Sequence, residues 1–272
     1  MTTMPTLRSA LRWVESQRTS GAVPSGRVRL PPSELRAGGE HFKDDNDYLA
    51  SALREVDRLT SLTGLNRASR LIDFGCGAGR LGVGIAERLG DIALYHGVDV
   101  QPELIKWARR HLGQAGRFKF IHIDDANARY NPAGLASSRI PLAGDATYDV
   151  FYAYSVFSHM RLSDVRSYLV EAARLLRPGG HAVFTAFVED DVPDEVENPV
   201  GYGPLTWRGA LHCVRFNRGL FDGLVRQAGF DVVHFEYGGE TDGQSFYVAE
   251  LPRSPHIVDV SSRDMRDTGK IV

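Results

Sequence analysis

The fold of this chain is decided by the stretch Leu71-Ile72-Asp73-Phe74-Gly75-Cys76-Gly77-Ala78-Gly79-Arg80. An apolar strand runs into an aspartate, and three alternate glycines follow before a helix begins. Glycine lets a backbone turn sharply and lets a ligand approach without a Cβ in the way. The loop is therefore predicted to bind a ligand, and the identity of that ligand decides the function.

The glycines fit two registers. Gly77, Gly79 and Gly82 spell the dinucleotide-binding pattern G-x-G-x-x-G, and an acid follows at Asp99, as in NAD(P)-dependent oxidoreductases. Gly75, Gly77 and Gly79 instead spell an acid-x-G-x-G-x-G loop that begins at Asp73. Each register predicts a different cofactor.

Asp73 favours the second register. A pyrophosphate at a helix N-terminus requires amide donors and positive potential, which a carboxylate just before the first glycine opposes. The same carboxylate suits an ammonium group and a sulfonium, and S-adenosylmethionine (SAM) carries both and has no phosphate. Asp99 suits the ribose hydroxyls in either register. We therefore predict SAM as the cofactor and keep the oxidoreductase as an alternative.

Composition limits the class of protein. The 272 residues are 43% hydrophobic and 24% charged, which is typical of a globular enzyme. A net charge of −2 gives no general attraction to nucleic acid, so no nucleic-acid partner is expected. Cys76 and Cys213 are the only cysteines, which makes a disulfide framework unexpected. With no secretory signal or membrane-spanning run, the expectation is a cytoplasmic protein without an integral membrane segment.

The pattern along the chain predicts three parts. They are an N-terminal leader at 1–66, with an arginine-rich arm and a helix over 47–62, a cofactor-binding domain at 67–251 with a substrate lid inserted at 188–218, and a C-terminal tail at 252–272. Strands are expected at 70–74, 93–99, 118–123, 148–154, 181–187, 230–237 and 244–251. Further helices are expected at 79–89, 102–112, 163–176 and 219–228, the third of these ended by Arg177-Pro178-Gly179-Gly180.

Strand–helix alternation with short connections indicates an α/β fold, a Rossmann-like doubly wound sheet. The glycine-rich connector at 238–243 predicts a closing hairpin, which gives seven strands, mostly parallel with an antiparallel last strand. Ligands of such sheets bind beyond the carboxyl ends of the strands. The glycine loop, Asp99, Asp124 and Tyr154 all fall at such ends, so one site is expected there.

Further motifs accompany the loop, and these are Gly97-Val98-Asp99-Val100-Gln101, Asp124 with Tyr130-Asn131-Pro132, Ser155-Val156-Phe157-Ser158-His159-Met160 and Leu175-Leu176-Arg177-Pro178-Gly179-Gly180. With them the chain resembles the class I SAM-dependent methyltransferases, in particular the bacterial type 11/12-like group with a Phe-Gly-Cys-Gly-x-Gly-Arg loop. The resemblance covers 67–187 well and 219–251 loosely. It implies a transferase (EC 2.1.1.-) that O-methylates a saccharide, a glycolipid or a small metabolite.

The resemblance also implies the cofactor-binding residues. Asp73 and the loop backbone would hold the methionine part, Asp99 the ribose, and Asp124 or Asp125 the adenine amine. The full set of expected cofactor positions is Asp73, Gly75, Cys76, Gly77, Gly79, Asp99, Val100, Gln101, Asp124, Asp125 and Tyr154. Asp124 and Asp125 also fit a helix or turn cap.

Methyl transfer to a hydroxyl requires alignment and the removal of a proton. A base with a pKa near 7 is best suited, which makes His159 the candidate general base, with packing at the start of the next helix as the alternative. The expected acceptor-lining residues are Tyr154, Ser155, Tyr202, Trp207 and His212, because aromatic faces bind sugars and flat rings.

Two charged segments have no assigned chemistry. Six acids lie within 189–197 and are expected to form a flexible, solvated lid, although carboxylates also suit magnesium; no metal is predicted. Six arginines within 1–36 are expected to form a solvated arm, with an anionic substrate group as the alternative. A non-catalytic SAM-binding protein and a homodimer both remain open.

Overall fold

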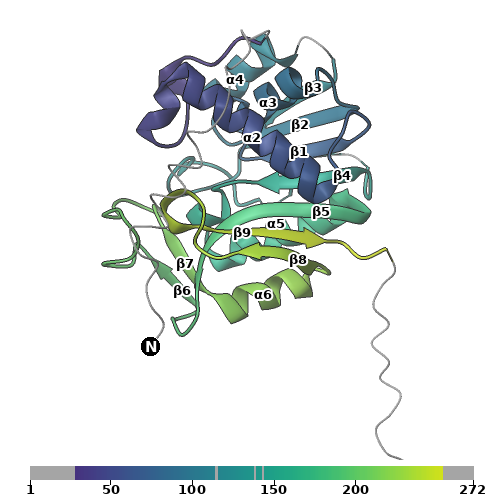
Figure 1. Ribbon diagram of the computed structural model, residues 1–272. Coiled ribbons are helices and arrows are strands. Elements are labelled where there is room, and N and C mark those ends of the chain that lie inside the picture. Colours follow the sequence, from purple (N-terminus) through teal and green to yellow (C-terminus); the bar gives the residue numbers. More distant parts are fainter. Residues whose placement is uncertain (1–27, 114–115, 138, 143, 254–272) are drawn as a thin grey trace, which may run out of the picture.

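One mixed sheet forms the centre of the molecule (Figure 1). The computed structural model describes residues 28–113, 116–137, 139–142 and 144–253. Five parallel strands lie side by side in the order β3 (Phe118–His122), β2 (Leu94–Asp99), β1 (Arg70–Phe74), β4 (Tyr148–Ala153) and β5 (Leu176–Glu189). The order reverses at β1, so the carboxyl ends of β1 and β4 border the crevice in which such sheets bind ligands.

An antiparallel hairpin completes the sheet. β9 (Ser245–Glu250) pairs antiparallel with β5, and β8 (Asp231–Glu236) pairs antiparallel with β9. These seven strands confirm the predicted doubly wound sheet with its antiparallel last strand. Two further strands, β6 (Glu195–Glu197) and β7 (Val214–Asn217), bring the total among the described residues to nine, and β7 runs parallel to the end of β5.

Helices cover both faces of the sheet (Figure 1). One face packs against α2 (Asp45–Thr63), α3 (Arg80–Arg88) and α4 (Pro102–His111), and the other against α5 (Leu162–Leu175) and α6 (Arg218–Gln227). Successive strand residues point to opposite faces, so Leu71 joins the first core and Ile72 the second. Both faces of the central strands are therefore apolar, as expected for a buried parallel sheet.

The predicted N-terminal helix is present as α2. Asp44 caps it by accepting from the amides of Asn46 and Asp47, and Gly64 ends it in the left-handed conformation. α2 lies very close to α3, since a Cβ at Gly84 would come 2.4 Å from the carbonyl oxygen of Ala52. The leader helix is therefore part of the core. Most of the arginine-rich arm and the tail beyond 253 lie outside the described residues, and the domain boundaries remain a prediction.

Two local predictions are wrong, the glycine-capped end of the helix that precedes β5 and the solvated character of the insertion. α5 ends at Leu175 and passes directly into β5 through extended Leu176, so Pro178 and Gly179 belong to the strand. The pairing of β5 with β4 shifts register there, and Gly179 takes a φ of +80° within this irregularity.

The insertion at 188–218 is also more ordered than a solvated lid. It contributes β6 and β7, and four of the six acids at 189–197 lie within 4.0 Å of an arginine. Arg161 binds Glu195 at 2.9 Å and also Glu197, while Arg215 binds Glu189 at 2.8 Å. No group of three or more potential metal ligands gathers in the part of the chain that the structure describes. Among the same residues, no helix is long and apolar enough to cross a membrane.

Candidate active site

The glycine loop connects β1 to α3 through three left-handed residues. Gly75, Gly77 and Gly79 have φ values of +78°, +55° and +88°. The amides of Gly75 and Cys76 both donate to the carbonyl of Val98 in β2, at 2.8 and 3.1 Å. A Cβ at Gly75 would lie 2.4 Å from Val156, whereas a Cβ at Gly77 would meet nothing within 4 Å. The space over Gly77 is therefore open to a ligand.

Asp73 lies beneath this loop. Asp73 is only 3% exposed, and its carboxylate accepts a hydrogen bond from the hydroxyl of Tyr95. Burial raises the pKa of Asp73 to about 7, against the lowering effects of the Tyr95 hydrogen bond and the nearby charge of Arg80. Because so little of Asp73 is exposed, its charge is the property that would reach a ligand above the loop.

Asp99 ties the loop to the next strand end. One carboxylate oxygen accepts from the amide of Gly77 at 2.8 Å, and the other accepts from the amide of Gln101 at 2.9 Å. Burial raises the pKa of Asp99 as well. Asp99, Val100 and Gln101 are all half-buried.

Three other predicted cofactor positions differ in their surroundings. The side chain of Cys76 is buried and packs against Gly97, which leaves only its backbone for a ligand contact. Asp125 is buried and accepts from the hydroxyl of Tyr168, so it is engaged in the core. Asp124 is exposed and accepts from Asn131 at 3.0 Å. Of the two acids, Asp124 is the one that remains accessible for adenine.

Tyr154 and Ser155 follow β4 and are held by the connector between β8 and β9. The hydroxyl of Tyr154 donates to Glu240 at 2.9 Å and lies 3.0 Å from the hydroxyl oxygen of Thr241. Ser155 has a φ of +55°, which is uncommon for a residue with a Cβ. Its hydroxyl accepts from Gln244 at 3.0 Å, and its amide donates to Thr185 at 2.7 Å.

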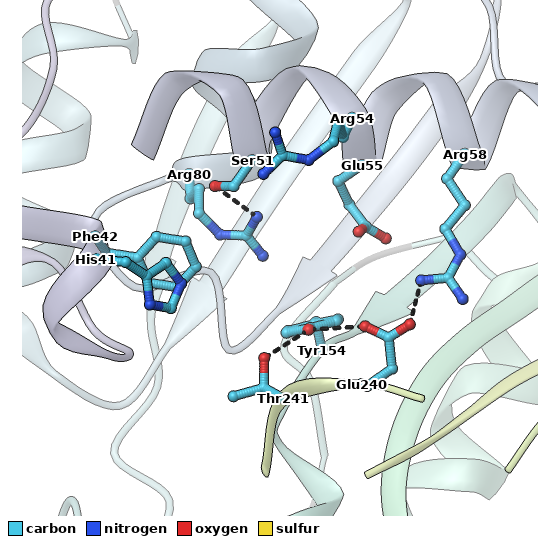
Figure 2. A pocket seen from close by; sticks show the side chains of 10 residues that line it. All are labelled: His41, Phe42, Ser51, Arg54, Glu55, Arg58, Arg80, Tyr154, Glu240 and Thr241. Atoms are coloured by element: carbon cyan, nitrogen blue, oxygen red, sulfur yellow. Dashed lines mark hydrogen bonds and ion pairs between the residues drawn. The ribbon is translucent and has the colours of Figure 1, made fainter. Parts of the chain in front are cut away.

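A cavity of about 200 Å³ lies between α2, the start of α3 and this connector (Figure 2). Arg80 and Glu55 reach into it from α3 and α2, and Tyr154 and Glu240 form its opposite wall. The guanidinium of Arg80 lies 5.3 Å from the ring centre of Phe42 and 5.4 Å from that of Tyr154. Tyr154 is the one predicted site residue that borders this cavity.

His159 lies at the end of a short 3₁₀ turn, Phe157–His159, after β4. Its Nδ1 is 3.0 Å from the carbonyl oxygen of Leu211, which only accepts, so Nδ1 carries the proton and Nε2 is left as an acceptor. Burial lowers the pKa of His159 to about 4, below the value near 7 on which its choice as a base was founded. The ring is therefore neutral at physiological pH.

The aromatic residues of the insertion form a small core of their own. Trp207 is buried against Phe187 and Cys213, and its indole N–H donates to the carbonyl of Tyr202 at 2.7 Å. The ring of His212 packs edge-on against Trp207 at 5.2 Å. None of Tyr202, Trp207 and His212 borders the cavity, so their expected role as acceptor-lining residues gains no support from it.

Three residues of the site were not predicted to take part in it. Arg80 ends the glycine loop motif, Glu55 interrupts the apolar face of α2, and Glu240 lies in the glycine-rich connector. Helical spacing places Glu55 on the same buried face as Ala52 and Leu59, which is the signal that could have identified it.

Comparison with known protein families distinguishes the two glycine registers. Residues 72–182 match the family model described as a methyltransferase domain. This part of the chain is similar to methyltransferase domains. The matched part runs from β1 into β5 and includes the glycine loop, Asp99 and His159. The match therefore supports the SAM-binding interpretation of the loop over the dinucleotide-binding one.

Two proteins similar to this chain are also named methyltransferases. Methyltransferase GfsG of Streptomyces halstedii is 27% identical over 188 residues, which cover 69% of this chain and 62% of the relative. O-methyltransferase cnsE of Penicillium expansum is 27% identical over 183 residues, which cover 65% of this chain and 59% of the relative. The chain thus spans about three fifths of the length of these two relatives.

The fold is also similar to that of a solved structure. The [4+2]-cyclase SpnF has a TM-score of 0.55 and 17% identity, with 90% of this chain and 93% of SpnF covered. At this identity the likeness concerns the fold alone.

Proposed function

We propose that this chain is a SAM-dependent methyltransferase that transfers the methyl group to a hydroxyl of a small molecule or saccharide. The observation that carries the proposal is the clustering of acids around the glycine loop. Asp73, Asp99 and Glu55 are all carboxyl groups whose pKa is raised by burial. A ligand with positive charge favours their ionised forms, whereas a pyrophosphate opposes them.

The residues present fit such a donor. Bound SAM would supply a methyl group made electrophilic by the sulfonium. Gly77 has no side chain and so leaves room for the methionine part. The hydrogen bonds from two backbone amides to Asp99 hold its carboxylate at the strand end where ribose hydroxyls are expected. Exposed Asp124 lies beyond the next strand, in the direction of the adenine. These assignments are proposals for Asp73, Gly75, Gly77, Asp99, Gln101 and Asp124.

His159 is proposed as the general base. The bond from its Nδ1 to Leu211 fixes the tautomer and leaves Nε2 able to accept the proton of an acceptor hydroxyl. The pKa of about 4 makes it a weak base but keeps it neutral, and thus competent, over the whole physiological range. Alignment and exclusion of water would then supply most of the acceleration.

A hydroxyl acceptor is supported by two observations outside the loop. The Penicillium relative is named an O-methyltransferase. Hydroxyl chemistry is also the case in which a positioned histidine is useful, because the nucleophile must lose its proton. A saccharide, glycolipid or small metabolite remains the proposed acceptor class.

A second candidate is a SAM-binding protein that transfers no methyl group. The likeness to the cyclase SpnF favours keeping it, since that protein has a similar fold and a name from another reaction class. Fold alone therefore does not decide whether methyl transfer occurs.

Incubation of the full chain with SAM labelled in the methyl group, and with a small-molecule extract of the source cells, tests the proposal. We expect label in a product whose methyl resonance is that of an ether. The variant Asp73→Asn is the control for the extract, since it should transfer less label. SAM binding without any labelled product would support the second candidate, and label on nitrogen or carbon would contradict O-methylation.

A further inference from the structure

The carbonyl that contacts His159 belongs to a residue with an unusual backbone. Leu211 has a φ of +48°, a left-handed conformation that is unfavourable for a residue with a bulky side chain. Such a conformation persists only where the surrounding contacts enforce it, and it is found preferentially at functional sites. The contacts that hold Leu211 therefore also hold the carbonyl oxygen that lies 3.0 Å from Nδ1 of His159.

One carboxylate holds the amide of the same residue. Oε1 of Glu197 on β6 accepts from the N–H of Leu211 at 2.8 Å. Oε2 of Glu197 accepts from the guanidinium of Arg161, which lies two residues after His159 in the sequence. Hydrogen bonds to a carboxylate are stronger than those between neutral groups. Glu197 therefore connects the turn that carries His159 to the residue whose carbonyl orients the imidazole.

The next residue of the chain fixes the same segment at further points. The amide of Asn198 donates to the carbonyl of Cys213 at 2.7 Å, and its side-chain oxygen accepts from the amide of Cys213 at 3.0 Å. The side-chain nitrogen of Asn198 donates to the carbonyl of Gly209 at 2.7 Å. The end of β6 is thus bound to the chain on both sides of Leu211, so β6 and the Leu211 carbonyl are placed together.

The other acid of β6 serves a different element. Glu195 also binds Arg161, at 2.9 Å, but its second oxygen accepts from the amide of Leu162 at the start of α5, at 2.6 Å. Its hydrogen bonds within the described residues do not reach Leu211. Glu195 and Glu197 therefore share one strand and one arginine, and of the two acids only Glu197 contacts Leu211.

We propose that Glu197 is a positioning residue for His159 and acts through the backbone of Leu211. While the Leu211 carbonyl is held in place, Nδ1 of His159 keeps its proton and Nε2 is presented as the acceptor. An acid of the insertion then has a role in the reaction although it lies away from the reacting atoms. The inference rests on the proposed function in one respect, the assignment of His159 as the base.

Nitrogen NMR of the ligand-free full chain, with isotopically labelled histidine, tests the positioning without any substrate. Protonated and unprotonated ring nitrogens resonate at well-separated shifts, and the signals of His159 are those absent from His159→Gln. The wild type should show a protonated Nδ1 and an unprotonated Nε2 at neutral pH. Glu197→Ala should shift the population towards the other tautomer, because the Leu211 carbonyl is no longer held opposite Nδ1.

Three further variants make the result specific. Glu197→Gln keeps an oxygen that accepts from Leu211, and Glu195→Ala breaks the second pair of the same arginine, so both should retain the wild-type tautomer. Glu197→Asp keeps the charge on a shorter side chain and should shift the tautomer less than alanine does; it replaces Glu197→Ala if that variant does not melt cooperatively. An unchanged tautomer at folded Glu197→Ala or Glu197→Asp, or an equal shift in Glu195→Ala, would overturn the inference.

Turnover separates positioning from a general loss of stability. Transfer of label from SAM should fall by about tenfold or more in Glu197→Ala, while the affinity for S-adenosylhomocysteine should change by less than about twofold. In a chain that already carries His159→Gln, the same substitution should cost nothing further, because the two residues act as a unit. A full additional loss there would overturn the inference. If His159→Gln alone leaves turnover unchanged, the base assignment of the proposed function fails, and the tautomer measurement still decides whether Glu197 positions the ring.

Discussion

The hydroxyl of Tyr95 on β2 donates a hydrogen bond to the buried carboxylate of Asp73 on the adjacent strand β1. This bond and the charge of Arg80 favour the ionised acid, while burial opposes it with the larger effect and raises the pKa of Asp73 to about 7. Near neutral pH the acid under the glycine loop is therefore partly protonated. Binding of a cation above it is expected to expel that proton.

The first prediction concerns the pH dependence of SAM binding. Below the pKa of Asp73, binding must release a proton, so affinity should rise with pH by up to about tenfold per unit and level off above pH 7. Calorimetry in buffers of different ionisation enthalpy measures the released protons directly. Asp73→Asn should lose this component, which separates it from titration of the ligand itself.

Tyr95→Phe tests the same relationship from the other partner. Removal of the donor should raise the pKa of Asp73 further, so the affinity should level off at a higher pH than in the wild type. The ligand-free protein should also lose stability as pH rises between about 4 and 7, because the unfolded chain gives up this proton earlier. If the pH at which the affinity levels off is the same in Tyr95→Phe as in the wild type, the ionisation of Asp73 is not coupled to binding.

The second prediction separates the fold from ligand space at the glycine loop. Gly77 and Gly64 both have positive φ and nothing within 4 Å of an added Cβ. Alanine at either should cost about 1–2 kcal/mol of unfolding free energy for the left-handed backbone. Only Gly77→Ala should also weaken S-adenosylhomocysteine, because its Cβ enters the ligand's space. Equal binding by Gly77→Ala and Gly64→Ala would place the cofactor elsewhere.

The third prediction concerns His159. Its pKa of about 4 in the folded state lies below the ordinary 6.5, so the unfolded chain binds the proton more readily between these values. Its contribution to stability is thus present above pH 6.5 and lost as pH falls towards 4. In His159→Gln, the unfolding free energy from urea denaturation should therefore depend less on pH over that window.

If His159 is the general base, His159→Gln should also lower turnover by about 10²–10⁴-fold, with S-adenosylhomocysteine binding unchanged. Normal turnover in this variant would assign His159 to packing alone.

The fourth prediction concerns the wall of the cavity. Glu240 joins Arg58 on α2 to Tyr154 after β4, with its side chain only 7% exposed. Glu240→Gln leaves Arg58 with weaker partners and should cost about 1–3 kcal/mol of unfolding free energy, measured by urea denaturation. Glu40→Gln, which breaks the exposed pair with Lys43, should cost less than about 1 kcal/mol. A similar small loss in both would show that Glu240 does not anchor α2.

The central sheet could be predicted because local sequence and tertiary packing agree there. Leu71 and Ile72 place apolar side chains on both faces of the sheet, and glycines follow where the chain must turn. β6 and β7 could not be predicted, since each is short and becomes a strand only by pairing with the end of β5. The passage of α5 directly into β5 was missed because Pro178 and Gly179 are typical of a helix end as well as of a strand irregularity.

The positions of Asp73 and Asp99 could be predicted because both lie at the ends of strands beside the glycine loop, and their roles in binding stay a prediction. The site was not predictable where distant segments supply one side chain each. Glu55 lies on the leader helix and Glu240 in the last connector, and only folding brings them to Arg80. Trp207 was assigned to ligand binding from its residue type, but Phe187 and Cys213 bury it.

The central claim is that the glycine loop holds a SAM-type donor and no dinucleotide. Calorimetric titration of the full chain with S-adenosylhomocysteine, and separately with NAD, tests it most directly. The account predicts saturable binding of S-adenosylhomocysteine that Asp73→Asn and Gly77→Ala both weaken, with no heat of binding for NAD. Binding of NAD in the absence of binding by S-adenosylhomocysteine would contradict it.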